Sequence, residues 1–273
     1  MKDRRFYTEA NREAWNRAVR VMRPQRGESL ERDLARPDFS ALDRELAAQL
    51  AAIGLAGKAV AHFCCHNGIE LISILRQGAA RGVGFDIADE AVAEARKLAA
   101  LAGVAAEFER TDVYDIAATH DGRFDLVLFT IGGLCWLPDL PGVFRIAARL
   151  LRPGGDLVIS DLHPFTMMLP VPGEEAFHDP YRVEYSYFTG EPAVSCDGID
   201  YVGHTKYDST AKYDFPQKLS DVVNALLGAG FSLLSLTEYP HDIANLFGHL
   251  EKDGKVPLCY LLRARRAGID RGI

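Results

Sequence analysis

The stretch "KAVAHFCCHNGIELISILRQG", residues 58–78, indicates an apolar strand, a tight turn and then a helix. Gly68 lies in the turn, where glycine lets the backbone approach a ligand closely at the start of a helix. The turn also carries side chains that can bind metals or act as nucleophiles: His62, Cys64, Cys65 and His66. The stretch is therefore compatible with a metal site, a thiol catalyst or a cofactor-binding loop.

Strands and helices alternate along most of the chain. Further strands are predicted at "GVGFD", "AAEFER", "FDLVLFT" and "DLVISD", and helices at "ADEAVAEARKLAALAG" and "LPGVFRIAARLL". The alternation resumes with the helix "LSDVVNALLGAG" and the strands "FSLLSLTEY" and "PLCYLLRARR". This order predicts βαβ units, and hence an α/β, Rossmann-like fold whose mostly parallel sheet has helices on both faces.

The chain divides into three predicted segments. Residues 41–163 and 216–273 are expected to form the core, and residues 1–40 an N-terminal helical segment. Residues 164–215 show aromatic alternation in "YRVEYSYF" and around "YVGHTKYDSTAKY", which predicts an antiparallel β insertion because alternate side chains of a strand share a face.

The N-terminal segment is predicted to contain one short amphipathic helix. Its apolar stripe, preceded by Phe6 and Tyr7, recurs at helical spacing: Trp15, Val19 and Met22. We expect Pro24 and Gly27 to break this helix, because both residues disfavour a helix interior.

Composition restricts partners and location. The 273-residue chain has 31 Lys and Arg against 38 Asp and Glu, and its net charge of -7 argues against nucleic acid as the main partner. No apolar run is long enough to cross a bilayer, and "MKDRRFYTEANREAW" has no signal-peptide core, so no membrane partner and a cytoplasmic location are expected. In that compartment the five cysteines are expected to be reduced thiols.

Acidic residues follow successive predicted strands. Asp86 ends "GVGFD", about 20 residues after the glycine turn, where a carboxylate can accept hydrogen bonds from ribose hydroxyls. Asp112, in "TDVYD", follows the third strand, where it could accept from an adenine amino group. Each acid could instead be a helix cap or a solvated loop residue. The absence of G-x-G-x-x-G and of a Walker A loop disfavours NAD(P)-dependent and nucleotide-hydrolysing functions.

The ordered set "VAHFCCHNG…GVGFD…TDVYD…FDLVLFTIGGLCWLPDL…LLRPGGDLVISDLHP" resembles the class I S-adenosylmethionine-dependent methyltransferases. It is most similar to a bacterial small-molecule branch with a degenerate glycine motif, and "NREAWNRAV" resembles the helix that covers the cofactor in that branch. The resemblance covers residues 41–163 and, more weakly, 216 to the end. It implies S-adenosyl-L-methionine as cofactor and methyl transfer to O, N or C of a small organic acceptor.

The resemblance also implies a set of cofactor-binding residues: Tyr7, Trp15, His62, Cys64, Gly68, Asp86, Ile87, Asp112, Val113, Thr130 and Ile131. The turn residues would lie along the methionine moiety of the cofactor. Asp86 would contact its ribose and Asp112 its adenine, and Thr130 and Ile131, after the fourth strand, would lie beneath the sulfonium. The two N-terminal aromatic residues would close over the cofactor. The sequence departs from the family at His62, where an acid is usual, so the partner of the cofactor's ammonium group is unassigned.

Metal and thiol chemistry at the turn are disfavoured. Neighbouring residues of a strand point to opposite faces, so Cys64 and Cys65 do not converge on one tetrahedral metal, and the chain has no C-x-x-C pair. A cysteine nucleophile activated by His66 lacks a third group to orient it. We therefore interpret the turn as a cofactor loop and expect no metal.

Methyl transfer requires mainly positioning and exclusion of water, and a general base only where an acceptor proton must leave early. His163, in "SDLHPF" just past the fifth strand, is predicted to orient or deprotonate the acceptor. Structural or surface roles are expected for the later histidines His178, His204 and His241.

The aromatic residues of the insertion are predicted to cover the acceptor pocket or to fill a small sheet: Phe165, Tyr181, Tyr185, Tyr187, Phe188, Tyr201, Tyr207 and Tyr213. The alanine- and arginine-rich composition is typical of high-GC bacteria, in which this branch often modifies secondary metabolites, so a natural-product pathway is expected. Two alternatives remain: a protein methyltransferase, and a member of the fold that binds the cofactor without transferring methyl.

Overall fold

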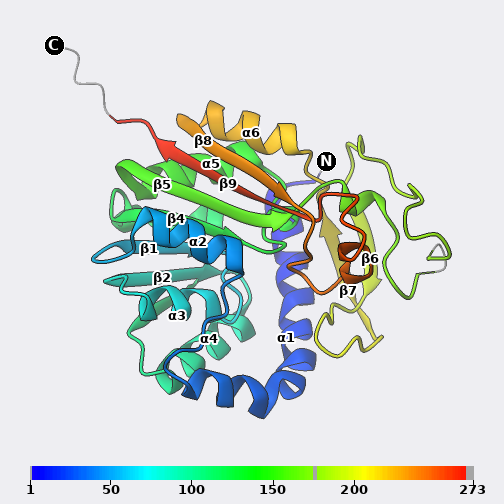
Figure 1. Ribbon diagram of the computed structural model, residues 1–273, viewed down its shortest axis with the longest axis horizontal. Coiled ribbons are helices and arrows are strands. Elements are labelled where there is room, and N and C mark those ends of the chain that lie inside the picture. The colour runs from blue at the N-terminus through cyan, green and yellow to red at the C-terminus, as the bar shows by residue number, and fades with distance from the viewer. Residues whose placement is uncertain (1, 175–176, 269–273) are drawn as a thin grey trace.

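The computed structural model describes residues 2–174 and 177–268, and its main feature is a seven-stranded sheet (Figure 1). In spatial order the strands are β3 (Ala106–Arg110), β2 (Arg81–Asp86), β1 (Ala59–Phe63), β4 (Phe124–Thr130), β5 (Leu151–Leu162), β9 (Cys259–Arg266) and β8 (Phe231–Tyr239). The first five are mutually parallel, and β9 is antiparallel to both of its neighbours. The predicted α/β, Rossmann-like fold with a mostly parallel sheet is confirmed.

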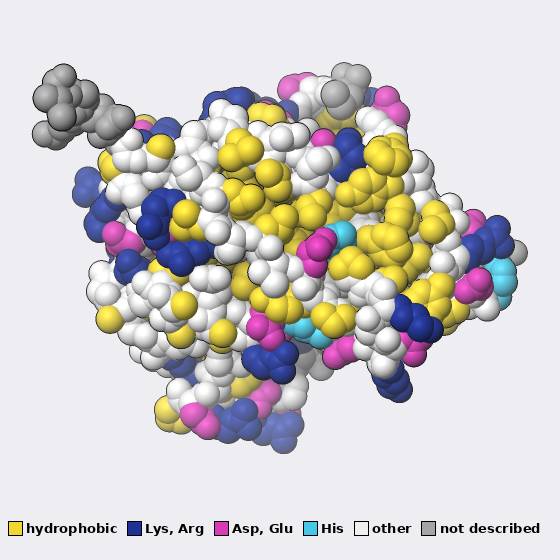
Figure 2. Space-filling view, turned by 45° about the horizontal axis from the view of Figure 1, so that its top comes forward, with side chains coloured by type: hydrophobic (Ala, Val, Ile, Leu, Met, Phe, Trp, Pro, Cys, Tyr) yellow, Lys and Arg dark blue, Asp and Glu magenta, His cyan; other side chains and the backbone are white. Residues whose placement is uncertain are grey.

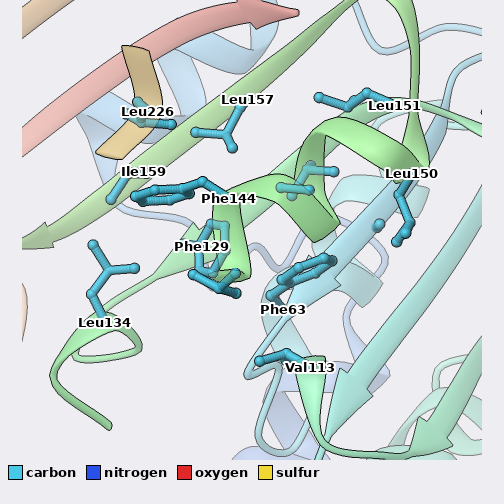
Figure 3. Packing of buried hydrophobic residues seen from close by; sticks show 14 of the residues in the cluster. Phe63, Val113, Phe129, Leu134, Phe144, Leu150, Leu151, Leu157, Ile159 and Leu226 are labelled. Atoms are coloured by element: carbon cyan, nitrogen blue, oxygen red, sulfur yellow. The ribbon is translucent and has the colours of Figure 1, made fainter. Parts of the chain in front are cut away.

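Helices cover both faces of this sheet. The helices α2 (Arg44–Ile53), α3 (Ile69–Arg76) and α4 (Asp89–Leu101) pack on one face, and α5 (Leu140–Leu150) and α6 (Leu219–Gly228) on the other. The strands are apolar on both sides, as burial of both faces requires. On the α5 side, the Phe129 ring lies 5.0 Å from Phe63 and 5.9 Å from Phe144 (Figure 3).

The N-terminal helix α1 (Arg4–Ala35), called the lid helix below, is longer than predicted. It begins before Phe6 and continues past Pro24 and Gly27, where the backbone is non-helical (φ 31°, ψ -128°) and the helix kinks. The prediction that these residues break the helix was therefore wrong in part. Tertiary contacts keep both halves in place: Val19 and Leu34 are fully buried on either side of the kink.

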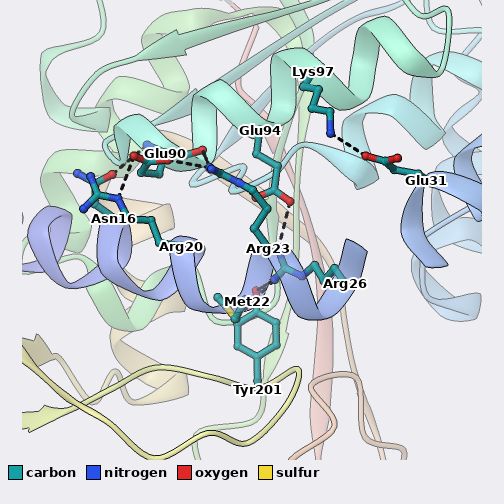
Figure 4. Close-up of polar contacts among 10 residues, drawn as sticks. All are labelled: Asn16, Arg20, Met22, Arg23, Arg26, Glu31, Glu90, Glu94, Lys97 and Tyr201. Carbon is teal, nitrogen blue, oxygen red and sulfur yellow. Dashed lines mark hydrogen bonds and ion pairs between the residues drawn. The ribbon is translucent and has the colours of Figure 1, made fainter. Parts of the chain in front are cut away.

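Ion pairs along α4 support the lid helix (Figure 4). Arg20 Nε donates to Glu90 Oε1 at 3.0 Å, Arg23 Nη2 donates to Glu90 Oε2 at 2.8 Å, and Lys97 Nζ donates to Glu31 Oε1 at 2.7 Å. The two helices are thus joined over most of the length of α4.

The insertion contains a separate two-stranded antiparallel sheet of β6 (Ala193–Asp197) and β7 (Asp208–Asp214), and β7 lies beside the lid helix (Figure 1). The segment "YRVEYSYF" forms no strand, although its alternation suggested one. Its backbone has no strand partner, and Glu184 and Tyr185 donate instead to the carbonyl of Met168. Alternation alone does not make a strand when no neighbouring strand accepts its hydrogen bonds.

Short helices complete the described chain: η1 (Val113–Asp115), η2 (Ala118–His120), η3 (Leu134–Trp136), η4 (Thr166–Met168) and α7 (Gly248–Glu251). Among the residues that the structure describes, no helix combines the length and apolar character needed to span a membrane.

Candidate functional site

The turn after β1 is tightly folded against β3. Cys64 (φ 52°), His66 (φ 48°) and Gly68 (φ 74°) all adopt left-handed backbone conformations, which cost non-glycine residues about 1 kcal/mol or more each. A Cβ at Gly68 would lie 2.4 Å from the ring of Phe108, so only glycine fits there. Backbone strain repeated within one loop is typical of a ligand-binding site.

Asp86 joins this turn to the start of α4. Its carboxylate accepts from the backbone N–H groups of His66 and Ala88, both at 2.8 Å. Burial raises the pKa of Asp86 to about 6, although these hydrogen bonds oppose the increase. Each carboxylate oxygen has a second lone pair, so the side chain retains capacity to accept from a ligand. Ile87, the next residue, is half-buried.

The end of β3 meets the lid helix. The Asp112 carboxylate accepts from the backbone N–H of Tyr114 at 3.1 Å and begins η1, while Val113 is buried. Burial raises the pKa of Asp112, and Thr8 of the lid helix is a neighbour that lowers it. The second acid predicted from the sequence therefore has a capping role, and it also lies within reach of the lid.

The two predicted lid aromatics lie in different places. The Trp15 ring is 5.4 Å from His66 and 5.3 Å from Trp136, so Trp15 lies between the turn after β1 and the loop after β4. Tyr7 instead packs 5.1 Å from Tyr213 and 5.2 Å from Phe215, at the end of β7. Trp15 thus covers the turn, and Tyr7 connects the lid helix to the insertion.

His62 is not exposed to a ligand. Its side chain is fully buried and its Nε2 lies 2.8 Å from Thr130 Oγ1, linking β1 to β4. Burial lowers the pKa of His62 to about 3, so the ring is neutral near pH 7. Only backbone groups at this position can face a cofactor. Ile131, which follows Thr130, is 39% exposed beyond the sheet edge.

Asp161, the last residue but one of β5, organises the loop after β4 and was not singled out from the sequence. Its carboxylate accepts from the backbone N–H groups of Gly132 at 2.5 Å and Leu134 at 3.4 Å. Burial raises the pKa of Asp161 to about 6, against the effect of these bonds. The signal was present, because "DLVISD" ends in an acid as "GVGFD" does.

Asp214, the last residue of β7, was also missed. Among the described residues no hydrogen bond reaches its carboxylate, and burial raises its pKa to about 6. It neighbours Cys135, whose own pKa is raised by burial and by the charges of Asp214 and Asp161. The backbone N–H of Phe215 donates to the Cys135 carbonyl at 2.7 Å, which fixes the end of β7 against the loop after β4.

The raised pKa of Asp214 predicts a pH-dependent effect of Asp214→Asn. The folded-state pKa of about 6 exceeds the ordinary 3.8, so the favourable contribution of the neutral acid is lost as pH rises through 6. The amide side chain carries no such penalty, so the variant should gain about 1–3 kcal/mol in unfolding free energy relative to wild type between pH 4 and 7. Urea melts at both pH values measure this. Asp208→Asn, at the exposed other end of β7, is the control and should show no such gain.

His163 lies at the end of β5 with both ring nitrogens engaged. Its Nε2 is 2.7 Å from Glu238 Oε1, and its Nδ1 accepts from the backbone N–H of Phe165 at 3.1 Å. These partners place the proton on Nε2. In this arrangement neither nitrogen is free to take a proton from an acceptor, so the geometry does not favour the predicted role of His163 as a base.

The aromatic residues of the insertion do not form one surface. The Tyr201 ring lies 6.4 Å from His66, whereas Phe165 and Tyr181 pack in a separate cluster with residues around α7. Tyr185 and Phe188 are exposed, the latter by 81%. Figure 2 shows that hydrophobic side chains gather broadly over one face of the molecule, with a few acidic and histidine side chains among them.

Unpartnered polar atoms surround the turn after β1. Buried side-chain atoms without a hydrogen bond include His66 Nε2 and Asn67 Nδ2 in the turn and Arg26 Nη1 of the lid helix beside it. Such atoms destabilise a fold unless something pairs with them, so their gathering indicates a polar ligand. The described part of the chain contains no cluster of three or more His, Cys, Asp or Glu side chains arranged to hold a metal.

Comparison with known proteins agrees with this geometry. A family described as "Methyltransferase domain" matches residues 60–155. The ubiquinone biosynthesis O-methyltransferase of Sodalis glossinidius is 34% identical over 124 residues, which are 45% of this chain and 49% of that protein. The match therefore spans about half the length of this curated relative.

Solved structures share the fold over most of the chain. An S-adenosylmethionine-dependent methyltransferase from Mesorhizobium loti superposes with a TM-score of 0.56 at 22% identity, covering 85% of this chain and 100% of that one. The [4+2]-cyclase SpnF superposes with a TM-score of 0.53 at 17% identity, covering 85% of each chain.

Proposed function

We propose that this protein transfers the methyl group of S-adenosylmethionine to a small organic acceptor, because residues 60–155 match a family described as "Methyltransferase domain" and the chain shares its fold with S-adenosylmethionine-dependent methyltransferases. The observation that supports the proposal most is the strained turn after β1, with Asp86 bonded to it and unpartnered polar atoms around it. Oxygen is the first acceptor atom to test, since a curated relative is an O-methyltransferase. We also propose a role in secondary metabolism.

The residues at the strand ends bind different parts of the cofactor. When bound, S-adenosylmethionine supplies an electrophilic methyl group on a sulfonium that is a good leaving group. Asp86 accepts hydrogen bonds from the ribose hydroxyls and Asp112 accepts one from the adenine amino group. The backbone from Cys64 to Gly68 lies along the methionine moiety. Trp15 excludes water above the turn, and its ring face favours a nearby sulfonium cation.

The acceptor side is formed by the loop after β4 and the end of β7. Thr130 and Ile131 begin that loop, Asp161 fixes its backbone, and Asp214 faces it without a partner of its own. A hydroxyl acceptor there can donate its proton to Asp214, whose pKa of about 6 suits a base near neutral pH.

His163→Ala tests the role in acceptor chemistry predicted from the sequence. Because Glu238 and Phe165 occupy both ring nitrogens, we expect the kcat–pH profile to keep its shape and the melting temperature to fall. Removing the buried ring leaves a cavity and a Phe165 N–H without its acceptor, at a cost of about 1–3 kcal/mol, whereas the half-exposed Glu238 carboxylate can bond to water. A profile that loses one titration at nearly unchanged stability would restore His163 as a base or orienting group.

Two alternatives belong to other classes. A protein acceptor would require an open groove rather than a closed pocket, and a member of the fold that binds the cofactor without methyl transfer would release no S-adenosylhomocysteine. One similar structure is that of a [4+2]-cyclase, so this fold also occurs in a protein named for a reaction other than methyl transfer.

The deciding experiment follows product formation. Purified protein is incubated with S-adenosylmethionine and a panel of small phenols, alcohols, amines and carbon acids, with a denatured protein lysate as the macromolecular arm. Acceptor-dependent S-adenosylhomocysteine, with a matching mass gain of one methylene on a small molecule, supports the proposal. Cofactor binding without product from any arm contradicts it and favours the non-transferring alternative.

A further inference from the structure

A side chain of the lid helix bonds to the backbone of β7, which lies beside that helix (Figure 1). Asn11 Nδ2 donates to the Tyr213 carbonyl at 2.9 Å, and Asn11 Oδ1 accepts from the Tyr213 backbone N–H at 2.7 Å. One residue of a neighbouring antiparallel strand would make the same two bonds. Asn11 is only 3% exposed, so its amide takes the place of a third strand beside the two-stranded sheet.

The residues on both sides of Asp214 are fixed from outside the small sheet. Tyr213 precedes it and is bonded to Asn11. Phe215 follows it, and its backbone N–H donates to the Cys135 carbonyl at 2.7 Å. Asp214 itself is in register with β6. The backbone at Asp214 is therefore held by three elements: the lid helix, the loop after β4 and the neighbouring strand.

Aromatic contacts fix the direction of the Asp214 side chain. The rings of Tyr213 and Phe215 both pack on Tyr7 of the lid helix, with centres 5.1 and 5.2 Å from it. Alternate side chains of an extended chain lie on opposite faces, so the carboxylate between them points away from Tyr7. A displacement of Tyr213 would therefore change both the position and the direction of the acid that follows it.

Asn11 can change the surroundings of Asp214 without changing any charge. Burial raises the pKa of Asp214 to about 6, against the effect of Lys212. The Lys212 ammonium itself donates to a carbonyl of β6 at 2.9 Å. The titratable side chains around the carboxylate come from several elements: Lys212 of β7, Cys135 of the loop after β4, Asp161 of β5 beyond it, and Tyr7 of the lid helix. Replacing the neutral Asn11 leaves all of them in place.

We propose that Asn11 is a positioning residue, whose two bonds to Tyr213 hold Asp214 at the acceptor side of the site. The role of Asp214 as a base rests on the proposed function, whereas its placement by Asn11 does not. Through this link the helix that covers the turn after β1 also sets the geometry of the group that receives the acceptor's proton.

The titration of Asp214 in Asn11→Ala tests the placement without any acceptor. Stability relative to the matching Asp214→Asn protein reports this titration, because the protonated acid stabilises the fold below about pH 4 and that contribution is lost as pH rises through 6. Asn11→Ala frees the end of β7, so water reaches the carboxylate. The upper end of the window should then fall by about one pH unit or more, which is a tenfold weaker binding of the proton. Urea melts of wild type, both single variants and the double variant between about pH 4 and 8 measure the shift.

Asn16→Ala is the matched control on the same helix. Asn16 also makes two bonds, donating to Asp89 Oδ2 and accepting from the Glu90 backbone N–H, both at 3.0 Å (Figure 4). Both bonds lead to α4 and neither to the insertion. This variant should lose stability and keep the wild-type titration of Asp214.

An unchanged titration in Asn11→Ala overturns the proposal, and so does an equal shift in Asn16→Ala, which would mean a general loosening of the lid helix. Asn11→Ser leaves space for a water that bonds to Tyr213, so it supplies a second, less perturbed variant and should give a smaller shift.

Activity distinguishes this placement from the proposed function. With an acceptor identified by the panel above, Asn11→Ala should lower kcat about 10- to 100-fold, leave the KM for S-adenosylmethionine within about twofold, and lower kcat no further in the Asp214→Asn protein. A wild-type protein that forms no methylated product removes the proposed function, while the titration still decides whether Asn11 places Asp214.

Discussion

Replacing Gly68 by alanine is expected to lower the free energy of unfolding by about 2–5 kcal/mol and to abolish measurable cofactor binding. Two effects add at this position. The backbone has φ 74°, which costs an L-residue about 1–2 kcal/mol, and the new Cβ would lie 2.4 Å from the Phe108 ring, which must then move within a packed core. Urea denaturation and calorimetry with S-adenosylhomocysteine measure both consequences.

Gly103→Ala is the matched control for Gly68→Ala. Gly103 ends α4 in a left-handed conformation (φ 65°), but no atom lies within 4 Å of a Cβ built there, so its replacement should cost only the backbone strain and leave binding intact. In the double variant Gly68→Ala with Phe108→Leu, the smaller side chain should relieve the overlap, so the combined loss should be less than the sum of the single losses. Equal stability losses for Gly103→Ala and Gly68→Ala would show that the contact with Phe108 is unimportant.

The core was predictable from the sequence because local patterns determine it. Strands β1, β2 and β4 are short apolar runs, and polar residues stand at or just after the ends of β2, β3 and β4, so the positions of Asp86, Asp112 and Thr130 at one edge of the sheet follow from strand order. The same rule points to Asp161, which the sequence analysis passed over. Hydrophobic periodicity therefore locates the strand-end residues of a parallel sheet, but it does not say which of them bind backbone and which bind ligand.

Residues that depend on contacts between distant segments were not predictable in this way. Arg26 and Tyr201 are 175 positions apart, and nothing local to either residue indicates that they bond. The surroundings of Asp214 likewise depend on the loop after β4, which is distant in the sequence. The extent of the lid helix has the same origin, because burial and ion pairs with α4 outweigh the unfavourable local preferences of Pro24 and Gly27.

Asp86→Asn is expected to weaken S-adenosylhomocysteine binding roughly 100-fold, because hydrogen bonds to an ionised acceptor contribute about 1.5–3 kcal/mol each. The amide also disturbs the turn, since its NH₂ group would face one of the two backbone N–H donors, from His66 or Ala88, that the carboxylate accepts. The variant should therefore lose more affinity than ribose contacts alone explain, and calorimetry at about pH 7.5 measures the loss, well above the carboxyl's raised pKa.

The pH dependence of binding distinguishes direct contact between Asp86 and the ligand from an indirect effect of Asp86 on the turn. Its pKa of about 6 means that the carboxylate is protonated as pH falls below 6, and a protonated acid accepts less well from ribose hydroxyls. Wild-type affinity should therefore fall by up to about tenfold per pH unit below pH 6, whereas Asp86→Asn should lack this titration. Asp121→Asn, an exposed acid paired with Arg149, is the control and should keep the wild-type profile. Parallel profiles for wild type and Asp86→Asn would remove Asp86 from the cofactor site and assign the titration to another buried acid, such as Asp161 or Asp214, whose pKa is also about 6.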